Sequence, residues 1–237
     1  MDRFSMQLQE QCTICGTLQT FEFNRGDARD DGACRTCGAR LKDRDAAHFL
    51  LAHATPDLLP SIKALTEEQP EVVPLIVEFA YSSALSNQLR DHPNYEQRYF
   101  WLSGRTEKTS AGHEVPFCDL HNTGFDDASK DFVVTNDAIS FVDDLTSVLQ
   151  EMCRVIRRGG AFIAINKVDW PVPRETIELE SSAQKTYTVP DGEMQQRRII
   201  GSDISKLFSK TGFRLMLRQV GFSQSSKRNF SLIGVRV

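Results

Sequence analysis

Four of the six cysteines form two C-x-x-C pairs near the N-terminus, Cys12 with Cys15 and Cys34 with Cys37. Two thiolates that are two residues apart can reach one ion from a tight turn, and a second pair completes a tetrahedron around it. This spacing predicts a zinc site. Because four thiolates leave no coordination position open for a substrate, we expect a structural ion and not a catalytic one.

The alternative for these cysteines is two disulfides in an exported protein. The first ten residues, MDRFSMQLQE, lack the apolar stretch of a signal peptide, so we expect a cytoplasmic protein whose reduced cysteines favour a metal. No segment approaches the roughly 18 apolar residues of a membrane helix, so no membrane association is expected. A net charge of −4 and a pI near 5.8 make nucleic acid an unexpected partner.

The elements around the cysteines can be predicted in outline. Residues 1–40 should form a zinc ribbon, with a short strand, a polar turn and a return between the two cysteine pairs. Few of these residues are apolar, so metal binding should supply part of the free energy of folding. Apolar residues at helical spacing predict a helix over 41–54, inside a linking segment of 41–69 that leads to a main domain of 70–237.

Two other groups of residues could hold a metal or an anion. Cys118 lies near His113 and His121 in the sequence, but loop histidines are more often solvated, so we assign no second metal site. Arginines within 154–158 lie at the end of a predicted helix, where positive charge is favourable. We therefore do not assign them to phosphate or nucleic-acid binding.

The main domain alternates short apolar runs with helical stretches, which predicts a doubly wound α/β fold. Continuous apolar runs are typical of strands that are buried on both faces of a parallel sheet. The predicted strands lie within residues 75–79, 99–102, 115–117, 132–134, 162–165, 213–217 and 231–237.

Two helices in the second half have clear signals. Apolar residues recur at helical spacing over 145–156, with Asp143 or Asp144 as the N-cap and Gly159 as the end. A second helix is predicted over 204–210, with Ser202 or Asp203 as its cap. Between them, residues 170–194 are predicted to be a long irregular insertion, either a substrate lid or an ordered connection.

The segment 125–165 resembles the central signature of class I S-adenosylmethionine-dependent methyltransferases, in particular the type 11 group. A strand runs into the Asn136–Asp137 turn, and a helix that contains Leu149, Glu151 and Arg154 ends before Gly159-Gly160 and the next strand. A zinc ribbon ahead of such a domain resembles a bacterial subgroup of these proteins. The resemblance implies a Rossmann-like, seven-stranded methyltransferase sheet whose last strand is antiparallel.

The resemblance also implies where the cofactor would bind, and the chain departs from the family there. The family's first strand leads into E-x-G-x-G-x-G, whose glycines let the backbone approach the cofactor. Here Glu78 is kept, but Ala80, Ser82 and Ala84 replace the three glycines. The loop is therefore a degenerate one, and the resemblance assigns Glu78, Ala80 and Ser82 to the cofactor site.

Three further positions are assigned to the cofactor by the same resemblance. Ser103 stands where an acidic residue normally binds the ribose hydroxyls, and it can donate only one hydrogen bond. Asp119 is kept where the family holds the adenine amino group, and Asn136 begins the turn after the fourth strand. Phe141 stands where relatives often carry histidine.

Methyl transfer requires mainly alignment of the two reactants, because the sulfonium is already activated. Candidates for a general base are His121, Asp137, Lys167 and Asp169, and we name no catalytic residue. Two hypotheses follow. The protein is a methyltransferase that acts on a small molecule or saccharide, or it is a non-catalytic relative that binds a ligand or a protein partner.

Overall fold

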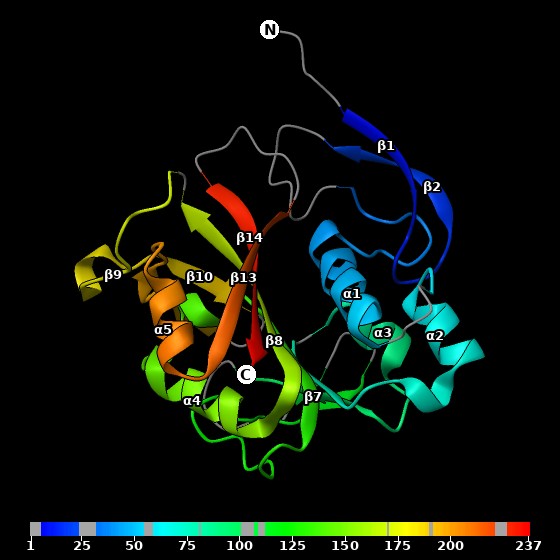
Figure 1. The fold of residues 1–237 in the computed structure, drawn as a ribbon. Coiled ribbons are helices and arrows are strands. Elements are labelled where there is room, and N and C mark those ends of the chain that lie inside the picture. Colours follow the sequence, from blue (N-terminus) through cyan, green and yellow to red (C-terminus); the bar gives the residue numbers. More distant parts are fainter. Residues whose placement is uncertain are drawn as a thin grey trace, which may run out of the picture.

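The structure is a computed structural model that describes residues 6–23, 32–54, 59–80, 82–100, 107–108, 112–169, 171–189, 192–220 and 227–237. Its main feature is a six-stranded sheet with helices on both faces (Figure 1). Among these residues, no helix has the length and apolar character that crossing a bilayer requires.

The central sheet has the strand order β13-β14-β8-β7-β3-β4. The strands β4, β3, β7 and β8 are parallel to one another, whereas β14 is antiparallel to both of its neighbours. The predicted antiparallel last strand is therefore confirmed. The strand bounds are Ile76–Phe79 (β3), Tyr95–Arg98 (β4), Lys130–Asn136 (β7), Ile156–Asp169 (β8), Phe213–Val220 (β13) and Lys227–Arg236 (β14).

The predicted seventh strand is wrong as a full strand within the described part of the chain. It is reduced to a single parallel bridge between Tyr99 and Phe117. Pro116 has no N–H to donate to a ladder. The preceding residues form the small hairpin of β5 (Glu107–Lys108) and β6 (Glu114–Val115) instead.

The strand predicted over 99–102 is also displaced, because β4 lies four residues earlier. With only a bridge beside it, β4 is close to the edge of the sheet, and its residues Glu96, Gln97 and Arg98 are only partly buried. A strand in that position does not need the apolar run by which we predicted it.

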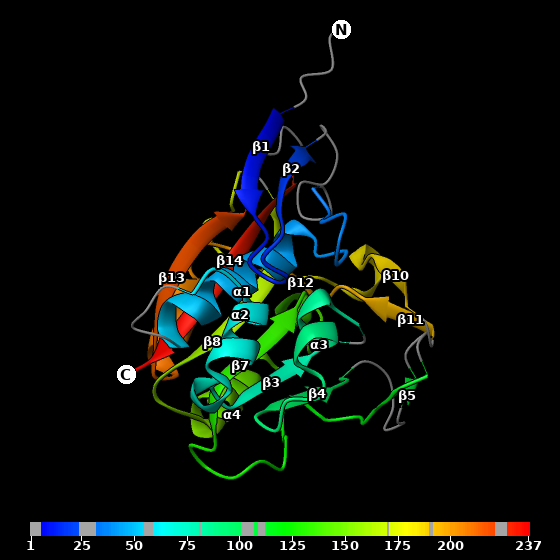
Figure 2. The same ribbon diagram turned by 90° about the vertical axis from the view of Figure 1, so that its right-hand side faces the viewer.

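Helices cover the two faces of the sheet separately (Figures 1 and 2). One face packs against α1 (Leu41–Ala54), α2 (Ile62–Glu68) and α3 (Ala84–Leu89), and the other packs against α4 (Leu145–Val155) and α5 (Ile204–Lys210). Short 3-10 turns lie at Pro70–Val72 (η1), Ala138–Ser140 (η2) and Ser181–Ala183 (η3).

The predicted limits of α1 and α5 are confirmed, and those of α4 are confirmed at its start. Asp144 caps α4, since its carboxylate accepts hydrogen bonds from the amides of Thr146 and Ser147. The helix ends at Val155 and not at Gly159, because the chain turns directly into β8. Arginines 157 and 158 therefore lie on β8 and not on the helix.

The caps predicted for α5 are wrong. Asp203 occupies the N-cap position, but its carboxylate accepts hydrogen bonds from the amide and hydroxyl of Thr176. The hydroxyl of Ser202 donates to the carbonyl of Arg174. Both side chains therefore bind the segment 174–176, which is distant in the sequence, and neither caps the helix.

The predicted irregular insertion has secondary structure of its own. Strands β10 (Thr186–Val189) and β11 (Gly192–Gln195) form a hairpin that projects from the domain in Figure 2. Strand β9 (Ile177–Glu178) pairs with β12 (Arg198–Ile199). The irregular character predicted for this segment is therefore wrong.

The N-terminal module is built on the hairpin of β1 (Met6–Gln11) and β2 (Leu18–Phe23). The hairpin flanks the first cysteine pair. Its second strand, β2, confirms the short strand predicted between the pairs, whereas the turn and return predicted after it lie in 24–31, outside the described residues. Arg44 of α1 lies over the ring of Phe21, with 3.6 Å from the guanidinium carbon to the ring centroid. The hydroxyl of Thr13 donates to the carbonyl of Arg44 at 2.8 Å.

One hydrophobic core joins this module to the main domain. It contains Ile14 and Phe21 of the module, Leu50 of α1, and Ile76 and Phe132 of the sheet. The module is therefore held by packing against α1 and does not project as a free appendage.

Candidate cofactor and metal sites

The four cysteines of the predicted zinc site lie together. The sulfur atoms of Cys12 and Cys37 are 3.8 Å apart, and those of Cys15 and Cys34 are 3.6 Å apart. All four sulfur atoms lie within 4.8 Å of one another. A tetrahedral zinc site with Zn–S bonds of about 2.3 Å requires sulfur atoms about 3.8 Å apart. Two of the sulfur–sulfur distances match this value, and all four atoms are close enough together to share one ion.

Each cysteine pair lies in a tight turn that directs backbone N–H groups toward the sulfur atoms. Gly16 donates to the carbonyl of Cys12, and Gly38 donates to the carbonyl of Cys34, with φ angles of +77° and +73°. Burial would raise the pKa of Cys34, but hydrogen bonds from the backbone of Cys37 and neighbouring donors lower it to about 6. At Cys34 such donors favour the thiolate form that binds metal, whereas burial raises the pKa of Cys12 to about 11 and raises that of Cys37 as well.

A second candidate site lies at the carboxyl ends of the strands, and we name it the strand-end pocket. Its volume is about 410 Å³. It combines residues that follow β4, the bridge at Phe117 and β7 with residues of the β10–β11 hairpin. Its lining consists of Phe100, Asp119, Leu120, His121, Phe141, Val142, Asp143, Glu193, Met194, Gln195 and Arg197. Doubly wound sheets bind their ligands at this end.

Asp119 and His121 form a linked pair in the strand-end pocket. Oδ1 of Asp119 accepts from the backbone N–H of His121 at 2.9 Å and lies 2.8 Å from its Nδ1. Burial raises the pKa of Asp119, but these hydrogen bonds outweigh it and leave the pKa below its usual value. The second oxygen of Asp119 has no hydrogen bond with the described residues, so a ligand can bind to it.

Nε2 of His121 accepts a long hydrogen bond of 3.3 Å from the amide of Asp144. With Nε2 as the acceptor, the proton of a neutral ring is on Nδ1, which then donates to Asp119. Phe141, the residue that replaces the family's histidine, places its ring edge-on to Tyr187 with centroids 5.4 Å apart. The aromatic pair joins the pocket to the hairpin.

Glu78 lies beside this region but does not line the strand-end pocket. Its carboxylate is 1% exposed, and Oε2 accepts hydrogen bonds from Tyr95 at 2.6 Å and from Ser83 at 3.0 Å. Burial raises the pKa of Glu78 to about 7. The family resemblance assigns Glu78 to the cofactor, but here its Oε2 accepts hydrogen bonds from two side chains of the protein.

The rewritten loop after β3 is also satisfied internally. The amide of Ala80 donates to Arg98, and its carbonyl accepts from Gln97. Ser83 and Ser86 form a reciprocal capping box at the start of α3. Ser82 is exposed, and Ser103 lies outside the described residues, so the assignment of both to the cofactor stays a prediction.

Asn136 lies at the end of β7, and its Oδ1 is buried without a hydrogen-bond partner among the described residues. Thr135 and Asn166, on the opposite face of the sheet, also carry buried polar atoms without partners in that part of the chain. Unpaired buried groups of this kind require a water or a ligand. We did not predict Thr135 or Asn166, although Asn166 interrupts the apolar run of β8 and could have been noticed.

The candidate bases are placed unequally. His121 lines the strand-end pocket. Asp137 follows β7 with φ +59° and ψ 1°, a left-handed conformation that is uncommon for residues other than glycine, and its amide donates to the carbonyl of Ile165. Lys167 and Asp169 lie on β8, where their backbones pair with β14.

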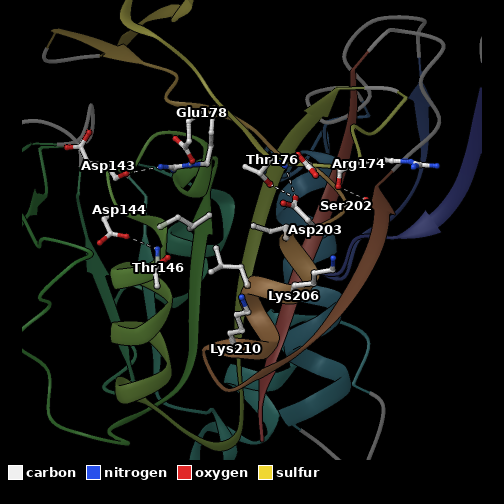
Figure 3. Close-up of a pocket in the computed structure, with 15 residues that line it drawn as sticks. Asp143, Asp144, Thr146, Arg174, Thr176, Glu178, Ser202, Asp203, Lys206 and Lys210 are labelled. Atoms are coloured by element: carbon white, nitrogen blue, oxygen red, sulfur yellow. Dashed lines mark hydrogen bonds and ion pairs between the residues drawn. The ribbon is translucent and has the colours of Figure 1, made fainter.

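A larger cavity of about 860 Å³ lies between the start of α4, α5 and the segment before β9, and we name it the α4–α5 pocket (Figure 3). It meets the strand-end pocket at Asp143, which lines both. The wall between the pockets contains Arg198, which is 1% exposed. Its guanidinium donates to the carbonyls of Ile139, Val142 and Asp143 and to Glu178, at 2.7 to 2.8 Å.

The sheet order and the helices on both faces are those of the Rossmann-like methyltransferase fold. A family model described as a methyltransferase domain matches residues 102–164, a segment that contains Asp119 and Asn136. This match confirms the resemblance to S-adenosylmethionine-dependent methyltransferases over that segment. No curated protein matches the sequence.

Solved structures with a similar arrangement include several methyltransferases. Geranyl diphosphate C-methyltransferase from Streptomyces coelicolor A3(2) is 11% identical, with a TM-score of 0.49 over 81% of this chain and 79% of that chain. For 1,6-didemethyltoxoflavin-N1-methyltransferase from Burkholderia thailandensis the values are 10%, 0.45, 74% and 80%. For an S-adenosylmethionine-dependent methyltransferase from Mesorhizobium loti they are 12%, 0.45, 69% and 91%.

Proposed function

We propose that the protein is a methyltransferase that uses S-adenosylmethionine to methylate a small molecule. The observation that carries the proposal is the strand-end pocket, which lies at the carboxyl ends of the sheet and is lined by Asp119. Its volume of about 410 Å³ falls within the range of small-molecule sites. The segment that matches the methyltransferase model supplies Asp119, Leu120, His121 and residues 141–143 of its lining.

The residues of the pocket fit part of this cofactor. The free oxygen of Asp119 can accept a hydrogen bond from the adenine amino group, and Phe100 and Leu120 offer apolar surface to the ring. Asn136 is not in the lining of this pocket, so its place in the cofactor site rests on the resemblance and on its Oδ1, which has no partner among the described residues. When bound, S-adenosylmethionine supplies an activated methyl group.

The acceptor is proposed to be a small molecule, with saccharides included. The β10–β11 hairpin contributes Glu193, Met194 and Gln195 to the pocket, so the acceptor would meet both apolar and hydrogen-bonding groups. His121 is the candidate base that lies in this pocket. In the transfer, the acceptor's lone pair forms the new bond to the methyl carbon, the carbon–sulfur bond breaks, and the acceptor's proton leaves to a base or to solvent.

The cysteine site is proposed to hold one structural zinc ion. The sulfur spacing and the four-thiolate donor set support zinc. Because the module shares a hydrophobic core with the main domain, we expect the ion to stabilise the main domain as well. In this proposal the ion stabilises the β1–β2 module against α1 and takes no part in methyl transfer.

Calorimetric titration with S-adenosylmethionine and S-adenosylhomocysteine tests the proposal directly. We expect saturable binding of both ligands by the zinc-loaded protein. Incubation with a panel of small-molecule acceptors should then release S-adenosylhomocysteine. An absence of binding at millimolar concentrations of both ligands would contradict the proposal.

A second candidate, a non-catalytic relative that binds a ligand or protein partner, is favoured by one observation. Hydrogen bonds among Glu78, Ser83 and Ser86 use polar groups of the described part of the loop after β3, so these groups do not remain for a cofactor. This candidate predicts binding of S-adenosylhomocysteine that is weak or absent, with no turnover of any acceptor. Product release above the uncatalysed rate would exclude it.

A further inference from the structure

The strand-end pocket depends on the turn of residues 119–122, which carries Asp119 and His121. Buried Leu120 holds this turn to the core. The side chains beside it are more open, with Asp119 52% exposed and His121 32% exposed. Residues 123–129 then form a loop that leads into β7. The directions of Asp119 and His121 therefore depend on what holds the start of that loop.

Glu151 of α4 holds the start of the loop. Its Oε1 accepts hydrogen bonds from the backbone N–H of Thr123 at 2.8 Å and from the hydroxyl of Thr123 at 2.7 Å. The side chain of Glu151 is 9% exposed, so water has little access to these hydrogen bonds. Because Thr123 lies two residues after His121, any shift of this contact would also move the residues of the pocket.

Arg154 fixes the direction of the Glu151 carboxylate. Its Nε and Nη2 donate to Oε2 and Oε1 of Glu151, both at 2.8 Å, in the two-point geometry that arginine forms with carboxylates. Its Nη1 donates to Asp127 of the same loop at 2.6 Å. Burial raises the pKa of Glu151, but hydrogen bonds from Arg154 and Thr123 outweigh it and lower the pKa to about 2. The carboxylate is therefore ionised at neutral pH.

The start of α4 contacts the same turn, since the amide of Asp144 donates to Nε2 of His121 at 3.3 Å. The loop thus lies beside α4 (Figures 1 and 2) and is bonded to both the beginning and the later part of this helix. Glu151 and Arg154 belong to the segment that resembles the methyltransferase signature, yet neither lines the strand-end pocket.

We infer that Glu151, oriented by Arg154, is a positioning residue of the strand-end pocket, which fixes the turn so that Asp119 and His121 face the ligand. The effect passes through Thr123, because Glu151 itself does not reach the pocket. The inference rests on the proposed function for the identity of the ligand, whereas the anchoring of the turn does not depend on it.

A double-mutant cycle with Asp119 tests the inference, with the affinity for S-adenosylhomocysteine measured by calorimetry. Glu151→Leu should weaken binding about tenfold, as Asp119→Asn should, because each variant removes the oriented carboxylate of the pocket. The combined variant should bind about as weakly as Asp119→Asn alone, since Glu151 acts through Asp119. A combined loss of about a hundredfold would mean that the two residues act independently, and would overturn the inference.

Ile204→Val is the matched control for a loss of stability. Ile204 is buried on α5 and does not line the strand-end pocket. The control should lower the melting temperature and leave the affinity for S-adenosylhomocysteine unchanged. If Glu151→Leu also lowers the melting temperature but keeps its affinity, the role of Glu151 is only structural and the inference is wrong.

Hydrogen exchange in the ligand-free protein, followed by NMR, gives a readout that does not depend on methyl transfer. The amides of His121 and Asn122 donate within the turn, to the side chain and the carbonyl of Asp119. They should exchange about tenfold faster in Glu151→Leu, but not in Ile204→Val. If the unaltered protein binds no S-adenosylhomocysteine, the proposed function fails, and this exchange alone decides whether Glu151 fixes the turn. Unchanged exchange would overturn the inference at any affinity.

Discussion

Replacing Glu78 with glutamine tests how the chain uses the acidic residue of β3. The carboxyl group is 1% exposed, and burial raises its pKa from 4.5 to about 7. Glutamine has the same shape, and its carbonyl oxygen can still accept hydrogen bonds from Ser83 and Tyr95. The variant therefore removes the titration and preserves most of the packing.

The sign of the effect follows from the raised pKa. Below pH 4.5 the carboxyl is protonated in both the folded and the unfolded state, and its contribution to stability is fully present. Between 4.5 and about 7 the unfolded chain loses this proton first, so the free energy of unfolding falls as the pH rises. Integration from pH 5 to pH 8 gives a loss of about 2 to 3 kcal/mol in the unaltered protein, which Glu78→Gln should not show.

Urea unfolding at pH 5, 6, 7 and 8 measures this difference, because pH effects common to both proteins, including those at the cysteines, cancel. Glu68→Gln is the control, since Glu68 is exposed at the end of α2. Its pH profile should parallel that of the unaltered protein. Parallel profiles for Glu78→Gln as well would show that the buried carboxyl does not titrate in this range, and our reasoning about it would fail.

Three further outcomes follow from the two sites. A strong chelator should remove one zinc ion per chain and lower the melting temperature, with metal analysis before and after as the measurement, and an unchanged melting temperature would contradict a shared core. Asp119→Asn should weaken S-adenosylhomocysteine binding about tenfold by calorimetry, and unchanged affinity would remove Asp119 from the cofactor site. Asn136→Leu should weaken S-adenosylmethionine binding, because it removes an acceptor. It should not lower the free energy of unfolding, because the lost oxygen is buried and has no partner among the described residues, which costs about 1 to 3 kcal/mol of stability.

The features that sequence predicted well are those set by neighbouring residues. The cysteine cluster follows from two short turns, and the helices over 41–54 and 204–210 follow from local apolar spacing. Asp144 could be predicted as the cap of α4 because capping involves only the next three residues. The doubly wound α/β class follows from the alternation of strands and helices, and the antiparallel last strand is implied by the resemblance to the methyltransferase family.

The features that sequence did not predict depend on contacts between distant segments. The displacement of β4 follows from its position near a sheet edge. The β10–β11 hairpin contains too few apolar residues to be predicted from an apolar pattern. Asp203 has the residue type and position of a helix cap, yet its carboxylate holds Thr176 from another segment. Helix-capping propensity cannot show which partner the carboxylate binds, because the competing partner, Thr176, comes from a distant segment.

Arg198 is the strongest case of such a contact, and it carries the last prediction. Its buried guanidinium joins β12 to three carbonyls of the segment after β7 and to Glu178, so it holds the wall between the two pockets. Arg198→Met should lower the free energy of unfolding by about 3 kcal/mol, because it leaves buried carbonyls without donors. Hydrogen exchange should also become faster in the β10–β11 hairpin, which this wall supports.

The adjacent Arg197 offers a matched comparison, because it differs from Arg198 in burial and not in chemistry. Its side chain is 38% exposed, and its ion pair is with Asp143, which is 77% exposed. Surface pairs of this kind contribute at most about 1 kcal/mol, so Arg197→Met should unfold close to the unaltered protein. Equal losses in the two variants would mean that the wall is held by packing of the hairpin, and that the carbonyl contacts of Arg198 are not what fixes it.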